Sequence, residues 1–311
     1  MQRNFTDFFL LGFTDLPPST QAILFTFFLC AYFLTIFGNG IIIVTLSFGT
    51  LLQTPMYFFL RNLSFHEICL TTSFIPKVLE NFLSKDRTIS FSGCALQMGI
   101  FFTIGISECV FLGIMAFDRY MAICHPLRYP MVMNTKLCYQ LTLASWSFGS
   151  FVSVAQTWYI FTLPFCRSRR IVHFFCDNPA IIKLACTNTF LINLLRLVSA
   201  FCAAGIPFLL ILCSYIKILS SILLIHSSEG RHKALSTCSS HLASVFLLYG
   251  TVLVTYLKFG TNGSDDNDRM VSLFYCNVIP VVNPLIYSLR NKEMKVAIRK
   301  FIFDETNKIS Y

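Results

Sequence analysis

Apolar residues fill seven long runs of this chain, and short polar stretches separate each run from the next. The helices that the runs predict cover about 22–48, 92–123, 137–161, 190–225 and 270–289, with another that starts near 54 and one that ends near 257. A membrane-spanning helix needs roughly 20 mostly apolar residues. The pattern therefore predicts an all-α membrane protein, a seven-transmembrane helix bundle with no room for a soluble catalytic domain.

Composition and charge support this prediction. Hydrophobic residues make up 55% of the chain and charged residues only 13%, which is too apolar for an ordinary soluble domain. The net charge of +9 raises the question of nucleic acid binding, but 13 of the 24 lysines and arginines fall on the predicted inner side of the bundle. That small bias weakly favours an outer N-terminus and an inner C-terminus, and we predict no nucleic acid partner.

The chain divides into three predicted parts. Residues 1–21 form an outer N-terminal segment with the sequon Asn4-Phe5-Thr6, so we expect glycosylation at Asn4. Residues 22–289 form the transmembrane domain, whose first span acts as an uncleaved targeting signal because no cleavage site precedes it. In the inner segment 290–311, apolar and basic residues alternate at helical spacing, which predicts a short amphipathic helix on the inner leaflet.

Several polar residues fall inside the predicted spans. Asn39, Glu67, Glu108 and Asn283 would each be costly in hydrocarbon, so they should face the bundle interior. They predict either a hydrated pocket for a sodium ion or a pair of acids that shares a proton. The alternative is a packed, neutral, hydrogen-bonded cluster without a functional role.

Four cysteines lie at predicted outer positions, where thiols oxidise. Cys166, Cys176 and Cys186 belong to the long segment between the fourth and fifth spans, and Cys94 begins the third span. Four cysteines allow three disulfide patterns, and the residues alone do not choose among them.

The third span ends in an adjacent acid, base and aromatic residue, Asp118-Arg119-Tyr120. Together with its neighbours, Met-Ala-Phe-Asp-Arg-Tyr-Met-Ala-Ile-Cys-His-Pro-Leu-Arg-Tyr over 115–129 closely resembles the signature of olfactory receptors, a branch of the rhodopsin-like G-protein-coupled receptors. The motifs at 54–63, 233–241 and 280–292 resemble the tetrapod-type, class II members of that family. Two residues depart from the pattern, Phe117 in place of a commoner tyrosine and Glu67 in place of an aspartate.

The resemblance implies an odorant receptor of the plasma membrane, crossing it several times, with an extracellular N-terminus and a cytoplasmic C-terminus. A small hydrophobic volatile would shift the bundle to a state that activates a stimulatory olfactory G protein and raises cyclic AMP. The resemblance also implies the disulfides Cys94–Cys176 and Cys166–Cys186. The residues that it assigns to the G-protein switch are Asp118, Arg119, Tyr120, Tyr215, Asn283, Pro284 and Tyr287.

A ligand site is expected among the outer halves of the third, fifth, sixth and seventh spans. Helical spacing places one set on a single face of the third span: Met98, Phe101, Phe102, Gly105 and Ile106. The resemblance adds Ser199, Ala203, Tyr249, Val252, Leu253, Tyr256, Leu273 and Cys276. This set predicts an apolar pocket with one or two hydroxyl groups, although Arg196 would instead favour an acidic ligand. We predict no cofactor and no metal site, since a disulfide-bonded Cys176 is not a thiolate ligand.

Three other functions compete with this interpretation. A chemosensory receptor outside olfaction would have the same fold, because the sequence does not encode where it is expressed. A small-solute transporter should contain matching broken segments in two halves of the chain, and the sequence has no such repeat. An intramembrane hydrolase should contain a nucleophile motif such as Gly-x-Ser-x-Gly, and His66 next to Glu67 is not one, so we predict that the protein is not an enzyme.

Overall fold

The computed structural model describes residues 7–48, 54–166, 168–224, 227–257, 265–290 and 294–299. Within these ranges it describes every side chain except those at 233, 236, 237, 255–257, 265–268 and 288–290. The elements, in chain order, are β1 (Asp7–Leu10), α1 (Pro18–Phe48), α2 (Pro55–Leu83), β2 (Thr88–Ser90), α3 (Phe91–Cys124), α4 (Tyr129–Val132), α5 (Thr135–Phe161), β3 (Arg170–Ile171), α6 (Asn178–Ile182), α7 (Phe190–Ala200), η1 (Phe201–Gly205), α8 (Ile206–Leu223), α9 (Ser228–Leu257), α10 (Asp265–Leu273), η2 (Phe274–Val278) and α11 (Ile279–Arg290).

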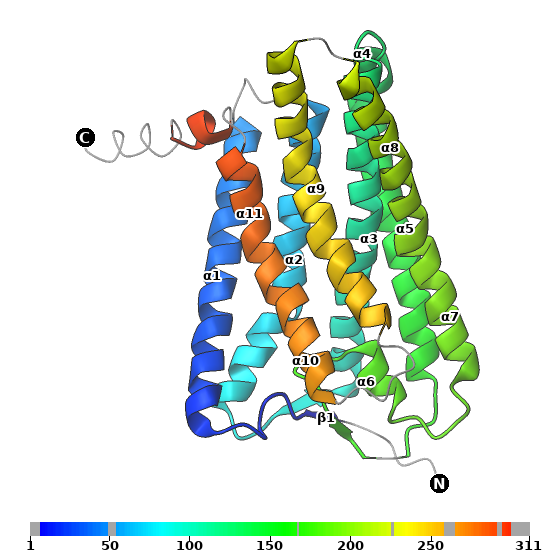
Figure 1. The fold of residues 1–311 in the computed structure, drawn as a ribbon. Coiled ribbons are helices and arrows are strands. Elements are labelled where there is room, and N and C mark those ends of the chain that lie inside the picture. The colour runs from blue at the N-terminus through cyan, green and yellow to red at the C-terminus, as the bar shows by residue number, and fades with distance from the viewer. Residues whose placement is uncertain are drawn as a thin grey trace.

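Seven helical rods stand side by side in the described part of the chain (Figure 1). Four are single helices α1, α2, α3 and α5, a fifth is α9, and the other two are the runs α7–η1–α8 and α10–η2–α11. β1 and α6 lie at one end of the bundle, which we call the outer end, and α4 lies at the inner end (Figure 1). The predicted seven-helix fold is confirmed. A short helix at 294–299 follows α11 at the inner end.

The surface of the bundle is that of a membrane protein. Large apolar side chains point outward along the rods, and Phe37, Phe151 and Trp158 are each more than 70% exposed. The rods Pro18–Phe48, Phe91–Cys124, Phe190–Leu223 and Arg269–Tyr287 are long and apolar enough to span a bilayer by length and hydropathy alone. α2 carries more polar residues and turns Ser64, His66 and Glu67 into the interior.

Two rods contain a π-turn, η1 and η2, and a proline follows each turn after one more residue. Pro207 and Pro280 have no backbone N–H, so each interrupts the regular hydrogen bonding of the preceding helical turn. A proline inside an apolar run is the sequence signal for such an irregularity. Both π-turns lie beside the cavity described below.

A small sheet at the outer end was not predicted. β1 is its central strand, antiparallel to β2 and parallel to β3. Phe8 and Leu10 of β1 point into the core and are each 1% exposed. The N-terminal segment is thus attached both to the start of α3 and to the loop that carries β3 and α6.

Candidate functional site

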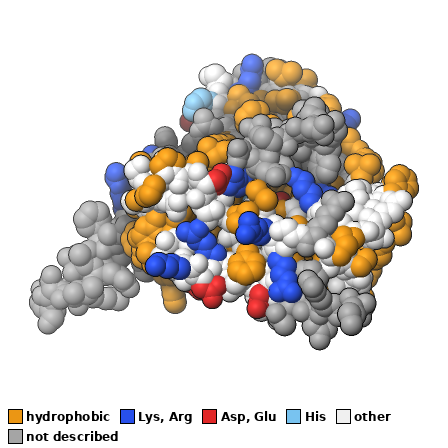
Figure 2. Space-filling model, turned by 90° about the horizontal axis from the view of Figure 1, so that it is seen from below, with side chains coloured by type: hydrophobic (Ala, Val, Ile, Leu, Met, Phe, Trp, Pro, Cys, Tyr) orange, Lys and Arg blue, Asp and Glu red, His pale blue; other side chains and the backbone are white. Residues whose placement is uncertain are grey.

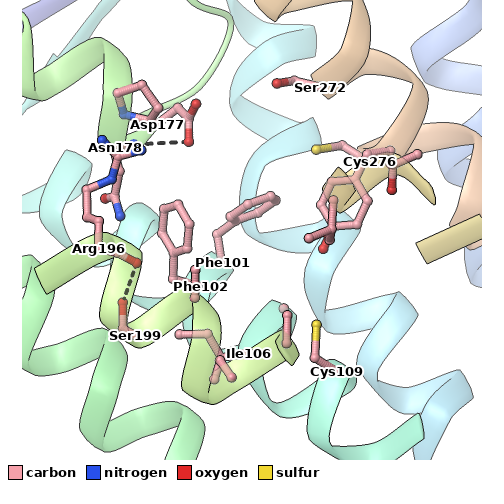
Figure 3. Close-up of a pocket in the computed structure, with 18 of the residues that line it drawn as sticks. Phe101, Phe102, Ile106, Cys109, Asp177, Asn178, Arg196, Ser199, Ser272 and Cys276 are labelled. Carbon is pink, nitrogen blue, oxygen red and sulfur yellow. Dashed lines mark hydrogen bonds between the residues drawn. The ribbon is translucent and has the colours of Figure 1, made fainter. Parts of the chain in front are cut away.

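A cavity of about 190 Å³ lies in the outer half of the bundle, inside the arc formed by α3, α7, η1, α9 and η2 (Figure 3). α3 supplies its floor with Phe101, Phe102, Gly105, Ile106 and Cys109. The remaining lining residues are Gln156, Phe175, Asp177, Asn178, Pro179, Arg196, Ser199, Ala200, Ala203, Ala204, Thr251, Val252, Val271, Ser272, Tyr275 and Cys276. Most of these side chains are apolar or small, so the cavity favours a compact, largely hydrophobic ligand.

One wall of the cavity is polar. Asn178 Nδ2 donates a hydrogen bond to Gln156 Oε1 (3.3 Å), Gln156 Nε2 donates to Ser199 Oγ, and Ser199 Oγ donates to the carbonyl oxygen of Arg196 (2.9 Å). Figure 3 shows this wall across the cavity from Ser272 and Cys276. The cavity therefore has more polar groups than the one or two hydroxyl groups expected from the sequence, and they are concentrated on one side.

The structure brings together eight of the thirteen predicted ligand residues. Phe101, Phe102, Gly105, Ile106, Ser199, Ala203, Val252 and Cys276 line the cavity. Met98 is instead packed in a core cluster with both cysteines of the Cys94–Cys176 disulfide, and Leu273 packs in the cluster around Phe174. Leu253 is 58% exposed on the outside of α9.

Two further predicted ligand residues are tyrosines of α9. Tyr249 lies outside the lining and donates a hydrogen bond to the Cys109 carbonyl (3.2 Å). The side chain of Tyr256 lies outside the described residues.

Gln156 and Ser272 line the cavity, although neither was predicted from the sequence as a ligand residue. Gln156 is a polar residue in an apolar span, and Ser272 precedes Cys276 by one helical turn, so both carried a sequence signal.

A loop covers the cavity from the outer side. The structure contains the disulfides Cys94–Cys176 and Cys166–Cys186, the pairs that the resemblance implied. Next to the first of them, the Cys176 N–H donates to Gln97 Oε1 (2.9 Å), and Gln97 Nε2 donates to the Ser73 carbonyl (3.3 Å). These bonds hold Phe175, which lines the cavity, against α2 and α3.

Basic side chains gather on the outer face of the molecule around this loop (Figure 2). Arg170 and Lys183, both exposed, belong to the loop itself. Such a face attracts anions over a distance of about one Debye length, roughly 8 Å at physiological salt.

The acid and base at the inner end of α3 form a buried ion pair. Arg119 Nη2 lies 3.5 Å from Asp118 Oδ2, and the two residues are 6% and 1% exposed. The Tyr129 hydroxyl of α4 donates a 2.8 Å hydrogen bond to Asp118 Oδ1. Burial raises the pKa of the Tyr129 phenol, so it keeps the proton that it donates. Tyr120 Oη and His125 Nε2 are 2.9 Å apart nearby.

A second group of polar contacts joins three rods, α3, α8 and α9, near this pair. His241 of α9 lies with Nδ1 2.8 Å from the Tyr215 hydroxyl of α8 and Nε2 3.1 Å from the Leu112 carbonyl of α3. Tyr215 was predicted as a switch residue, and the structure pairs it with His241 rather than with Arg119. His241 ends the motif at 233–241, which was the sequence signal for it. Tyr287, another predicted switch residue, is buried in the inner core.

The predicted polar core is divided between two groups of contacts. Asn283 Nδ2 donates to Glu67 Oε1, and Ser244 Oγ donates to Asn283 Oδ1 (2.9 Å), which links α11, α2 and α9. Asn39 Nδ2 bonds instead to the backbone carbonyls of Pro280 (3.2 Å) and Thr35 (3.0 Å).

Glu108 is 2% exposed in α3. Pro284, the remaining predicted switch residue, lies inside α11 and faces Gly38 of α1. A side chain at position 38 would contact it, since a Cβ atom built on Gly38 would lie 3.4 Å from the Pro284 Cβ. Asn4 lies outside the described residues. Within the described part of the chain, no three His, Cys, Asp or Glu side chains are placed to hold a metal ion.

Comparison with known proteins identifies relatives over almost the full length. The family model for olfactory receptors matches residues 28–305. Homo sapiens olfactory receptor 10A5 is 46% identical over 295 residues, covering 95% of this chain and 93% of that protein. Homo sapiens olfactory receptor 10AG1 is 47% identical over 296 residues (95% and 98% covered), and olfactory receptor 10A4 of the same species is 46% identical over 305 residues (97% of each).

Proposed function

The chain belongs to the olfactory receptor family, and from this premise we propose which of its residues bind the odorant and which pass the signal inward. As a family member the protein is a multi-pass membrane receptor that takes an odorant and couples to a G protein, and it is not an enzyme. One observation carries the proposal: a single helix, α3, lines the outer cavity with Phe101 and Ile106 and bears the buried Asp118–Arg119 pair at its other end. A change in how α3 packs at the cavity can therefore alter the inner end.

The cavity is the proposed odorant site. Its volume of about 190 Å³ is below the roughly 300–1,000 Å³ of pockets for drug-sized ligands, which supports a small volatile. The phenylalanines of α3 with Val252 and Tyr275 would enclose a hydrocarbon body. The polar wall at Gln156 and Ser199 would receive an oxygen-containing group, so the ligand is an oxygenated hydrocarbon rather than a bare one.

The inner end is the proposed switch, formed by Asp118, Arg119, Tyr120, Tyr215, Asn283, Pro284 and Tyr287. In the arrangement described above, the Asp118–Arg119 pair is held by Tyr129, and His241 ties α9 to α3 and α8. Outward movement of α9 would break both His241 contacts and free Tyr215 to approach Arg119. A G protein that binds this second state from inside would be coupled to an odorant that favours it from outside.

The partner proposed for this state is a stimulatory olfactory G protein, with cyclic AMP as the product of signalling. The polar core of Asn39, Glu67 and Glu108 would hold either a sodium ion or a shared proton, and dependence of basal signalling on sodium would separate the two. For the chain ends we propose a glycosylated Asn4 in an extracellular segment 1–21 and a cytoplasmic segment 290–311.

The test is expression of the full chain, tagged at its N-terminus, with a stimulatory olfactory G protein and measurement of cyclic AMP against a panel of volatiles. We expect a response to small oxygenated hydrocarbons and loss of that response in Arg119→Ala at equal surface level. An Arg119→Ala receptor that signals as well as the parent would contradict the switch. A parent receptor that reaches the surface and responds to no panel member would contradict the ligand site.

A further inference from the structure

Arg269 at the outer end of the seventh rod is bound to the N-terminal segment. Its Nη1 and Nη2 atoms donate two hydrogen bonds of 2.8 Å to the carboxylate of Asp15, and Nη1 also donates to the Gly12 carbonyl. The guanidinium carbon lies 5.8 Å from the centre of the Phe13 ring. Arg269 is 6% exposed, whereas the Asp15 side chain is 51% exposed, so a buried guanidinium meets a carboxylate at the outer surface of the bundle.

The segment that holds Arg269 is itself firmly attached. Phe13 is buried, and its ring centre lies 5.5 Å from that of Phe174 in the loop over the cavity and 6.2 Å from that of Phe28 in α1. The Gly12 N–H donates to the His173 carbonyl (3.0 Å). Gly12 has a φ of 53°, in the left-handed region that glycine adopts without strain.

Arg269 lies on the same face of the seventh rod as two residues that line the cavity. Ser272 follows it by three residues and Cys276 by seven, so the three side chains lie along one face. Ser272 and Cys276 line the cavity, whereas neither Arg269 nor Asp15 is among its lining residues. Cys276 belongs to the π-turn η2, which departs from regular α-helical hydrogen bonding and separates α10 from α11.

We propose that Asp15 and Arg269 are positioning residues for the odorant site: the N-terminal segment holds the outer turn of the seventh rod so that Ser272 and Cys276 face the ligand. The inference rests on the proposed function, because it takes the cavity as the odorant site. The segment 7–17 would then act on the site only through the seventh rod, because none of its residues lines the cavity.

The experiment compares Asp15→Asn, Arg269→Gln and the exchange Asp15→Arg with Arg269→Asp in the full-length receptor, using an odorant to which the parent responds. We expect each single variant to raise the EC50 about tenfold, with maximal and basal cyclic AMP per surface receptor unchanged, as for loss of a charge-assisted bidentate contact outside the ligand site. The exchange variant should recover most of this loss because it restores opposite charges.

The matched control is Glu80→Gln, which removes an exposed ion pair with Lys77 (2.9 Å) on α2 at the same outer end. It should leave the EC50 unchanged. A purely structural role for Asp15 would lower the surface level and the maximal response together without moving the EC50, and that result would overturn the proposal. An unchanged EC50 in both single variants would also overturn it, whereas a parent receptor that responds to no odorant would refute the proposed function first.

Discussion

At the outer end of α3, polar side chains from α5, α6 and α7 border a cavity, whereas at its inner end polar side chains pack directly against one another. The outer polar groups form a chain of neutral hydrogen bonds, Asn178 to Gln156 to Ser199. The inner ones include a buried ion pair, Asp118 with Arg119. A neutral network at a cavity can exchange one partner for a ligand at little cost, but a buried charge that loses its partner is strongly destabilised.

Under the proposed function, this contrast explains how the roles of the two ends would differ. The outer end would accommodate ligands of different shape because its hydrogen bonds are individually weak. The inner end has few low-energy arrangements, since Arg119 must be paired inside the bundle or reach solvent or a partner outside it. The neutral hydrogen bonds of the outer end suit ligand recognition, whereas the buried ion pair of the inner end suits a two-state switch.

The largest expected effect on stability follows from opening the outer end. Cys176→Ser removes the bond between the loop and α3, and loss of a native disulfide costs about 2–5 kcal/mol in small domains. We expect the surface level to fall to about a tenth of the parent's or less, measured with an N-terminal tag. Cys30→Ser, which changes an exposed free cysteine of α1, should leave the level unchanged.

Filling the cavity should abolish recognition without affecting the inner end. Ala203→Phe places a ring in the cavity, so we expect the EC50 for odorants to rise about a hundredfold or more while basal cyclic AMP stays constant. Leu253→Phe, on the outside of α9, serves as control and should behave as the parent does. A similar loss in both variants would show that the cavity is not the binding site.

Loosening the inner end should raise basal signalling and leave odorant recognition almost unchanged. Tyr129→Phe removes a hydrogen bond to Asp118, and a hydrogen bond to a charged acceptor contributes about 1.5–3 kcal/mol. Part of this free energy stabilises only the arrangement in which Asp118 and Arg119 are paired. Basal cyclic AMP per surface receptor should rise about fivefold, with little change in odorant EC50. Tyr139→Phe, on the exposed side of α5, is the control. No increase in basal signalling would separate Tyr129 from the switch.

Weakening one hydrogen bond of the polar wall should change ligand recognition and leave basal signalling unchanged. Ser199→Ala removes the hydroxyl between Gln156 and the Arg196 carbonyl, and a neutral hydrogen bond contributes about 0.5–1.5 kcal/mol. The EC50 for oxygenated odorants should rise about threefold to tenfold. Dose–response curves for a hydrocarbon of matched length should not move, and an equal shift for both ligands would contradict a polar head-group site.

The smallest expected effect concerns pH. The hydrogen bonds from Arg269 hold the pKa of Asp15 below its ordinary value of 3.8. Its stabilising contribution is therefore present at any pH above the ordinary value and is lost only as the pH falls through the lower folded-state pKa. The pair should therefore add no pH dependence to the odorant EC50 between pH 5 and 8, and Asp15→Asn should raise the EC50 by the same factor at each pH in that range. A shift confined to the parent receptor would contradict this.

The sequence alone determined the seven-helix architecture and the family, because both depend on local patterns. Runs of apolar residues long enough to span a bilayer leave the backbone no alternative to a helix. The motif over 115–129 identifies the inner end of α3 in the same local way, and it led directly to Asp118 and Arg119. On α3, the 3.6-residue period was enough to place Phe101, Phe102, Gly105 and Ile106 on one face.

Only the tertiary structure decided which residues from different rods meet. Leu253 and Val252 are neighbours in sequence, yet one faces outward and the other lines the cavity, because the rotation of α9 is set by its packing against α11, α3 and α8. The sheet around β1 joins residues 7–10 to 88–90 and 170–171, and the contact between Asp15 and Arg269 joins residues 254 positions apart, pairings that no local pattern encodes. Periodicity fixes the face of a single helix, whereas the partners of that face depend on how all seven rods pack together.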